Sequence, residues 1–295
     1  MDRKKFLLSL ATLPLAGAAM KFNDLTRITE PLKSSPRMPV LFLGHGSPMN
    51  AIEENEFVIG FRNVAQEVPR PQAVLCISAH WETRGTQVTA MEHPRTIHDF
   101  GGFPQALFDV RYPAPGSPEL AAETRRLVSS TDVILDQQWG LDHGAWSVVK
   151  HLYPNADVPI IQMSIDYTLS PEKHYALANE IAALRDKGVL VIGSGNMVHN
   201  LGMVAWDKLN ESYAFDWAQE ASDKMERAIT GGDHAPLINF HAQGRAFDLA
   251  INSGEHFLPL LYTLALQNTD ERATLFNAKP VAGSLTMTSV KIDKA

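Results

Sequence analysis

The sequence predicts an α/β fold in which a mostly parallel central sheet is flanked by helices, with a metal site at the carboxyl ends of the strands. Two observations support the fold class: unbroken apolar runs recur along the chain, and helix-like segments separate them. Such runs are typical of strands that are covered on both faces. We predict buried strands at residues 40–43, 73–77, 159–163 and 189–192.

Two segments carry the signals of a helix start. Ser117-Pro118-Glu119 and Ser170-Pro171-Glu172 each combine a capping serine, a proline for the first helical position and an early acid. The second helix is expected to reach Lys187 and to stop at Gly188. Residues 285–290 alternate roughly between apolar and polar, which predicts a half-exposed edge strand.

Composition limits the classes of function. The chain has 295 residues, a formal net charge of −7 and no basic stripe, which argues against nucleic acid as a partner. Cys76 is the only cysteine, so neither an intramolecular disulfide nor a cysteine-rich zinc cluster is possible. No apolar stretch is long enough for stable membrane insertion.

The N-terminus is expected to lie outside the folded domain. Residues 1–20 place a basic start before a short apolar stretch and Ala16-Gly17-Ala18, an order typical of a signal peptide. This pattern predicts export to the periplasm; the alternative is an N-terminal extension on a cytoplasmic protein. Residues 21–37 read as a linker, and residues 38–292 as a single catalytic domain.

Four histidines stand where predicted strands or glycine-rich turns end: His45, His80, His199 and His256. The carboxyl ends of parallel strands open into a common crevice, so these side chains are expected to converge there. Neutral imidazole is the commonest metal ligand and also titrates near neutral pH. The pattern therefore predicts a metal site with its own acid and base groups.

Other histidines leave alternatives open. Glu255 and His256 form either a helix-start pair, in which the dipole favours the acid, or a metal ligand supplied by one of the two. His143 is either a structural histidine held by Asp142 or a catalytic one. Surface positions are expected for the histidines in polar or helix-like contexts: His93, His151, His174, His234 and His241.

A long segment rich in glycine, proline and aromatic residues covers residues 96–104 and 112–116. Loops of this length are usually functional. We expect it to fold over the metal site and to supply an apolar wall for a ring-shaped substrate, with His98, Phe100 and Phe103 as substrate-binding residues.

The motifs resemble those of the class III (LigB-type) extradiol ring-cleaving dioxygenases, and in particular the DOPA 4,5-dioxygenase branch. The resemblance covers essentially everything from residue 38 to residue 292, in family order. Its segments are residues 42–49, 78–81, 96–104, 112–116, 142–144, 195–200 and 255–260.

The resemblance implies roles for the histidines. His45, His80 and His256 correspond to metal ligands, and His143 to a second histidine near the substrate. His199 corresponds to a fourth ligand in zinc-bound forms and to an acid/base group in the dioxygenase scheme. Broader class III enzymes use two histidines and one carboxylate, so Glu255 stays an alternative to His256.

The resemblance also implies a reaction. Three protein ligands leave open positions on Fe(II) for a catechol and O2. The expected reaction opens a catechol such as L-DOPA to 4,5-seco-DOPA; Zn(II) is the other metal expected at the site. Two rival hypotheses are a zinc hydrolase that uses an all-histidine site and a non-catalytic metal-binding protein.

Overall fold

A computed structural model describes residues 32–209 and 211–294. The predictions for the signal segment and for most of the linker fall outside these residues. One compact unit begins at Lys33. Among the described residues, no helix combines the length and the apolar character that crossing a bilayer requires.

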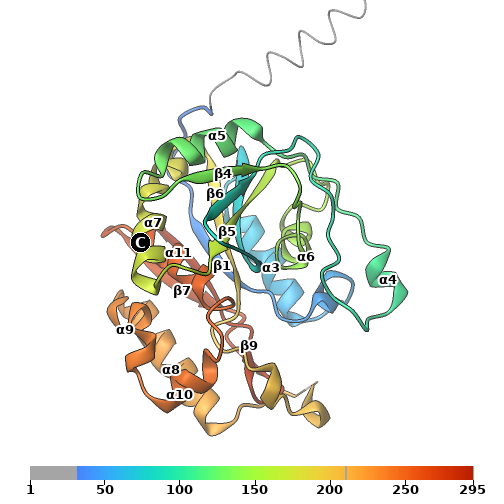
Figure 1. Ribbon diagram of the computed structural model, residues 1–295. Coiled ribbons are helices and arrows are strands. Elements are labelled where there is room, and N and C mark those ends of the chain that lie inside the picture. Colours follow the sequence, from blue (N-terminus) through green and yellow to red (C-terminus); the bar gives the residue numbers. More distant parts are fainter. Residues whose placement is uncertain (1–31, 210, 295) are drawn as a thin grey trace, which may run out of the picture. The chain divides into compact units, whose positions relative to one another are not determined.

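The fold is organised around an eight-stranded sheet with the order β4-β3-β5-β2-β6-β1-β10-β7 (Figure 1). The pairings of β5 with β2, β2 with β6, β6 with β1 and β3 with β4 are parallel, whereas β3–β5, β1–β10 and β10–β7 are antiparallel. The strands are β1 Val40–Gly44, β2 Ala73–Thr83, β3 Thr86–Thr89, β4 Val133–Asp136, β5 Ile160–Asp166, β6 Val189–Gly195, β7 Glu271–Phe276 and β10 Ser289–Lys294. This arrangement confirms the predicted α/β class with a mostly parallel sheet.

The four predicted buried strands form the centre of this sheet as β1, β2, β5 and β6. The prediction of an edge strand at residues 285–290 is wrong. Its first part, Leu285–Thr286, is β9, which pairs with β8 at Pro280–Val281 in a separate two-stranded sheet. Its last two residues, Ser289 and Val290, belong to β10, which is mostly buried. β10 is not an edge strand, because β7 pairs with the edge that was expected to be free.

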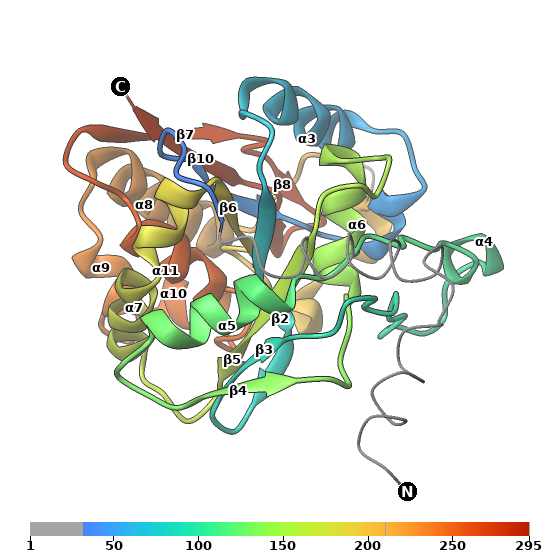
Figure 2. The same cartoon turned by 90° about the horizontal axis from the view of Figure 1, so that it is seen from above.

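Helices cover both faces of the sheet (Figure 2). On one face, Phe61 of α3 and Trp146 of α6 pack with Leu41 and Leu43 of β1 in one buried cluster. On the other face, α7 and α11 pack against each other, and α11 contacts β6, β1 and β2. The α-helices are α3 Glu56–Glu67, α4 Gln105–Phe108, α5 Pro118–Leu127, α6 His143–Leu152, α7 Pro171–Glu180, α8 Asp216–Gly231, α9 Ala235–Ile238, α10 Arg245–Ala250 and α11 Leu258–Ala265.

Both predicted helix starts are confirmed. In α5 the Ser117 hydroxyl accepts a hydrogen bond from the Leu120 N–H at 3.2 Å. The second helix begins at Pro171, tightens at Ile181 and continues to Lys187 as the 3₁₀ helix η2, Ala182–Lys187. It ends at Gly188, whose φ of 70° is the left-handed conformation that favours glycine. The other 3₁₀ segments are η1 Pro48–Ala51, η3 Leu201–Met203, η4 Trp206–Lys208 and η5 Phe240–Ala242.

A buried ion pair joins segments that are far apart in the sequence. The side chains of Arg185 and Glu271 are only 1% and 2% exposed. Arg185 Nη2 pairs with Glu271 Oε1, and Arg185 Nη1 donates to Glu271 Oε2 at 2.9 Å. Arg185 also donates to the main-chain carbonyls of Met38, at 2.7 Å, and Leu266. The guanidinium thus ties together the approach to β1, the end of α11 and the start of β7.

Replacing Arg185 with methionine is expected to lower the free energy of unfolding by about 3–5 kcal/mol, because Glu271 would remain buried without its partner. Urea denaturation measures the change. The half-exposed pair of Arg37 and Asp186 supplies the control, since Arg37→Met should cost less than about 1 kcal/mol. Equal losses in the two variants would contradict the structural role given to Arg185.

Candidate metal centre and active site

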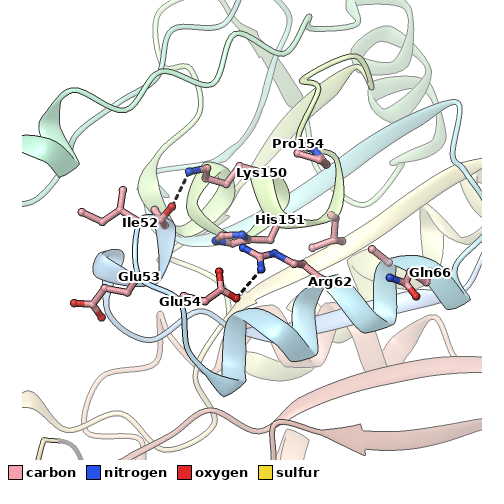
Figure 3. Close-up of a pocket in the computed structure, with 11 residues that line it drawn as sticks. Ile52, Glu53, Glu54, Arg62, Gln66, Lys150, His151 and Pro154 are labelled. Atoms are coloured by element: carbon pink, nitrogen blue, oxygen red, sulfur yellow. Dashed lines mark hydrogen bonds and ion pairs between the residues drawn. The ribbon is translucent and has the colours of Figure 1, made fainter.

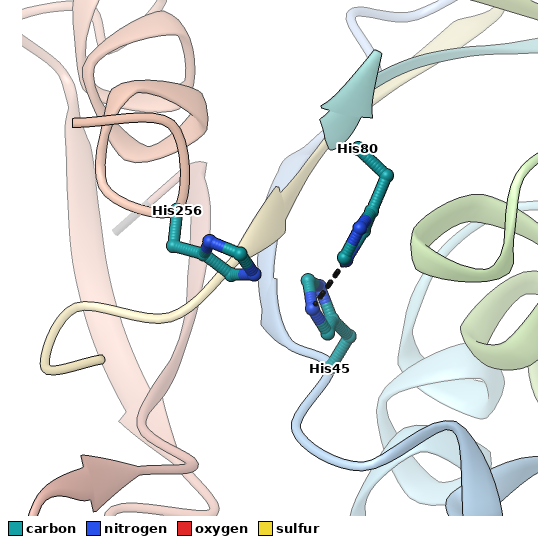
Figure 4. Close-up of side chains that lie close together, drawn as sticks. All are labelled: His45, His80 and His256. Atoms are coloured by element: carbon teal, nitrogen blue, oxygen red, sulfur yellow. Dashed lines mark hydrogen bonds between the residues drawn. The ribbon is translucent and has the colours of Figure 1, made fainter. Parts of the chain in front are cut away.

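Three histidines from separate parts of the chain meet at the carboxyl ends of β1, β2 and β6. His45 follows β1, His80 lies where the register of β2 shifts, and His256 directly precedes the entry to α11. Each offers one ring nitrogen, and these nitrogens lie within 4.8 Å of one another, so the three could hold a metal ion (Figure 4). His45 Nε2 and His80 Nε2 are 3.2 Å apart.

Two positions beside these histidines have room only for glycine, because neighbouring atoms lie too close for a Cβ. A Cβ on Gly195, the last residue of β6, would lie 2.1 Å from the carbonyl oxygen of His256. The next residue, Asn196, donates its N–H to that same oxygen at 2.9 Å. A Cβ on Gly144 would lie 2.8 Å from the ring of His80. Both glycines therefore allow ring-bearing segments to reach the strand ends.

The orientation of His45 follows from its partner Ser194, which lies on β6. The Ser194 hydroxyl donates its single proton to the carbonyl of Gly144 at 2.5 Å. The same oxygen lies 3.1 Å from His45 Nδ1. Because its only proton is already donated, it accepts the Nδ1 proton. This bond leaves a lone pair on Nε2, the nitrogen that faces His80.

A carboxylate oxygen lies beside the outer nitrogen of each of the other two rings. Glu255 Oε1 lies 3.0 Å from His256 Nδ1, and Asp99 Oδ2 lies 3.4 Å from His80 Nδ1. Metal-binding histidines usually engage a carboxylate or carbonyl through the nitrogen that does not face the metal. Glu255 lies where such an outer partner of His256 would lie, and Glu255 also forms a second possible ligand group with His199 and His256.

The surroundings keep His45 and His80 uncharged and the carboxylate of Glu255 charged. Burial, reinforced by neighbouring histidines, lowers the pKa of His45 well below its usual range and the pKa of His80 to about 2. Burial alone would raise the pKa of Glu255, but hydrogen bonds from His256 and Ser253 lower it to about 2. His45 and His80 are thus uncharged at neutral pH.

His143 also lines the site, and its partner differs from the expected one. Asp99 Oδ2 lies 3.0 Å from His143 Nδ1, and Asp99 Oδ1 accepts the backbone N–H of His143 at 2.9 Å. Asp142 instead caps α6 by accepting the Ala145 N–H at 3.1 Å, and it also accepts the Ser78 hydroxyl at 2.6 Å. Asp142 is therefore not the group that holds His143.

His199 stacks on His256, with ring centroids 3.6 Å apart and an angle of 10° between the planes. Burial, followed by the nearby His256, lowers the pKa of His199 to about 3. Its backbone N–H is bound to Ala250 O at 2.9 Å, but no side chain among the described residues hydrogen-bonds its ring. The ring is therefore uncharged at neutral pH and free to hydrogen-bond a molecule in the cavity.

A cavity of about 600 Å³ joins these histidines to an apolar wall. Phe100 and Phe103 line it, as expected from the aromatic loop. His98 does not: its Nε2 lies 3.0 Å from the Val110 carbonyl, and its ring packs behind Phe100. Four residues on the opposite side complete the wall: Leu201, Val204, Trp206 and Leu209.

Comparison with known proteins agrees with this arrangement. Residues 39–265 match the family described as the catalytic LigB subunit of aromatic ring-opening dioxygenase. The chain belongs to this family. The match confirms the enzyme class that the resemblance implied, a ring-cleaving dioxygenase.

Similar proteins cover nearly the whole of this LigB domain. The chain is 45% identical to 4,5-DOPA dioxygenase extradiol from Escherichia coli K12, over 88% of this chain and 97% of the relative. It is 34% identical to the protein of the same name from Beta vulgaris, over 85% and 94% of the two chains. The crystal structure of an uncharacterized Escherichia coli K12 protein matches with a TM-score of 0.74 and 39% identity, over 87% of this chain and 100% of that one.

Two groups that lie against the histidines of the LigB site were not predicted from the sequence: Asp99 and Ser194. Asp99 sits in the aromatic loop beside the residues proposed to bind substrate, so its position was a usable signal. No sequence signal pointed to Ser194, because a serine in a glycine-rich strand end resembles any turn residue. Its role depends on the parallel pairing that places Leu43 of β1 beside it.

Replacing Glu255 with glutamine is expected to weaken Zn(II) or Fe(II) binding about tenfold, because the charged partner of His256 is lost. Competition with a chromophoric chelator measures the affinity. Glu82→Gln is the matched control: burial, and then the nearby charge of Glu255, raise the pKa of Glu82, and no ion pair or hydrogen bond joins Glu82 to a histidine among the described residues. An unchanged affinity in Glu255→Gln, or an equal loss in Glu82→Gln, would contradict the role of Glu255.

Proposed function

We propose that this protein is an extradiol dioxygenase that opens the ring of a catechol such as L-DOPA, with Fe(II) held by His45, His80 and His256. One observation carries the proposal: three imidazole rings from separate parts of the chain bring one ring nitrogen each to within 4.8 Å of the others, beside an aromatic-walled cavity. The names of the relatives supply the choice of L-DOPA.

The donor set fits a divalent first-row metal. Imidazole nitrogen suits both Fe(II) and Zn(II), and zinc binds such sites more tightly. A bound Fe(II) would supply adjacent positions for the two catechol oxygens and O2, and would lower the pKa of the bound phenol. The purified protein is therefore expected to contain zinc, and to gain oxygenase activity only after iron replaces it.

Two further histidines provide the proton chemistry. His199 lines the cavity, and no side chain among the described residues hydrogen-bonds its ring, so it is placed to take a proton from the catechol and return it to the developing oxygen leaving group. Asp99 Oδ2 lies 3.0 Å from His143 Nδ1, and His143 lines the cavity. His143 is proposed to orient the substrate hydroxyl or dioxygen.

A zinc hydrolase would use the same ligands to activate water. Membership of a ring-opening dioxygenase family favours the oxygenase. The deciding experiment reconstitutes the metal-free protein with Fe(II) without oxygen, then follows oxygen uptake and the yellow product with L-DOPA and simpler catechols. Ester or amide hydrolysis by the zinc form, without oxygen uptake by the iron form, would overturn the proposal.

Replacing His199 with glutamine is expected to lower kcat for ring opening by about 10²–10⁴-fold, the usual contribution of a positioned acid/base group. Iron content, measured by elemental analysis, should stay close to that of the wild type, because three other rings form the inner group. Unchanged kcat would contradict the acid/base role. Loss of iron together with activity would instead make His199 a ligand.

A further inference from the structure

Acidic and basic side chains are not balanced among the residues that line the cavity of about 600 Å³. Apart from histidines, Glu53 is the one ionisable side chain among the described residues that line the cavity, and none of the lining residues is lysine or arginine. Histidines aside, the wall therefore offers a substrate substituent one carboxylate and no basic group.

Glu53 also differs from the other carboxylates around it. It borders a neighbouring hollow of about 650 Å³ that shares Leu209, Val281 and Met287 with the cavity. Each of the other three glutamates of this hollow has a basic partner, whereas no ion pair involves Glu53 within the described chain. The pairs are Arg62–Glu54, Lys279–Glu56 and Lys208–Glu211.

A close-up of the adjacent surface pocket shows the same contrast (Figure 3). Glu54 turns to Arg62, at 2.6 Å, and Lys150 donates to the carbonyl of Ala51, also at 2.6 Å. Glu53 points away from both basic side chains. Its carboxylate is therefore not neutralised from this side either.

The main chain holds Glu53 close to the metal-binding histidines. The Glu53 N–H donates to Met49 O at 2.9 Å, and Met49 lines the cavity. The side chain of Asn50 donates to His45 O, also at 2.9 Å. The turn that begins at His45 thus carries Glu53 to the cavity rim in a defined position.

We infer that Glu53 determines substrate specificity by pairing with a protonated amine on the side chain of the catechol. This inference rests on the proposed function. A carboxylate beside an apolar wall attracts a cation and repels an anion, and such walls strengthen the field at a cavity mouth. In L-DOPA, the ammonium group would face Glu53 and the substrate carboxylate would face solvent.

Three catechols that carry a two-carbon chain at the same ring position isolate the charge of its end group: the chain ends in an ammonium group in dopamine, has no further group in 4-ethylcatechol and ends in a carboxylate in 3-(3,4-dihydroxyphenyl)propionate. Calorimetry on the full-length zinc-loaded protein measures binding without turnover, and kcat/KM is measured on the iron-loaded protein. The wild type is expected to favour dopamine over the propionate by about fivefold, the scale of an exposed ion pair. Added salt should reduce this preference.

Two variants locate the charge. Glu53→Gln should abolish the preference for dopamine and leave 4-ethylcatechol binding within about twofold of the wild type. Glu54→Gln removes the same charge one residue away, from a side chain already paired with Arg62, and should keep the preference.

The inference is overturned if the zinc form binds the three catechols equally or binds none of them. It is also overturned if Glu53→Gln keeps the preference, or if Glu54→Gln loses it to the same extent. Failure of the iron form to open any catechol would contradict the proposed function instead, since the binding ratios decide the role of Glu53 independently.

Discussion

The site depends on one constraint: three imidazoles must each bring one ring nitrogen to within 4.8 Å of the others. Burial, reinforced by neighbouring histidines, lowers the pKa of His45 and of His80, so the rings do not relieve the arrangement by taking up charge. Ser194 and Glu255 hydrogen-bond the Nδ1 atoms of His45 and His256 from outside, and Asp99 Oδ2 lies 3.4 Å from Nδ1 of His80. The three rings are thus gathered before any metal arrives, and a metal ion would join them by bonds.

The sheet supplies the positions that this constraint needs. Parallel pairing of β1 with β6 and of β6 with β2 aligns three strand ends at one edge. The His45 N–H donates to Gly195 O at 3.1 Å, and Gly195 leaves room for the carbonyl of His256. The strands, the glycines and the outer partners therefore act together, and a change in any one of them displaces a ring.

The central strands, the helix starts and the converging histidines could be predicted because their signals are local: apolar runs, capping serines and residues at strand ends. Other features depend on tertiary partners that no local pattern contains. β10 resembles an edge strand until β7 covers it, and His174 resembles a surface residue although it is fully buried and bonded to Tyr262 at 2.9 Å. Similarly, His98 and Asp99 are neighbours in sequence, yet one packs behind the wall while the other orients His143.

The positions of Glu255 and Glu53 affect the charge that a substrate meets at each end of the cavity. A carboxylate among the inner ligands would cancel part of a metal's charge, whereas three neutral imidazoles cancel none of it. With Glu255 one step behind His256, a metal would keep its full attraction for the two oxygens of a catechol. The ring oxygens would then balance the metal, and any charge on the substituent would be left to the cavity rim. There the available partner is Glu53, so the neutral inner group and the acidic rim together favour an anionic ring end with a cationic tail.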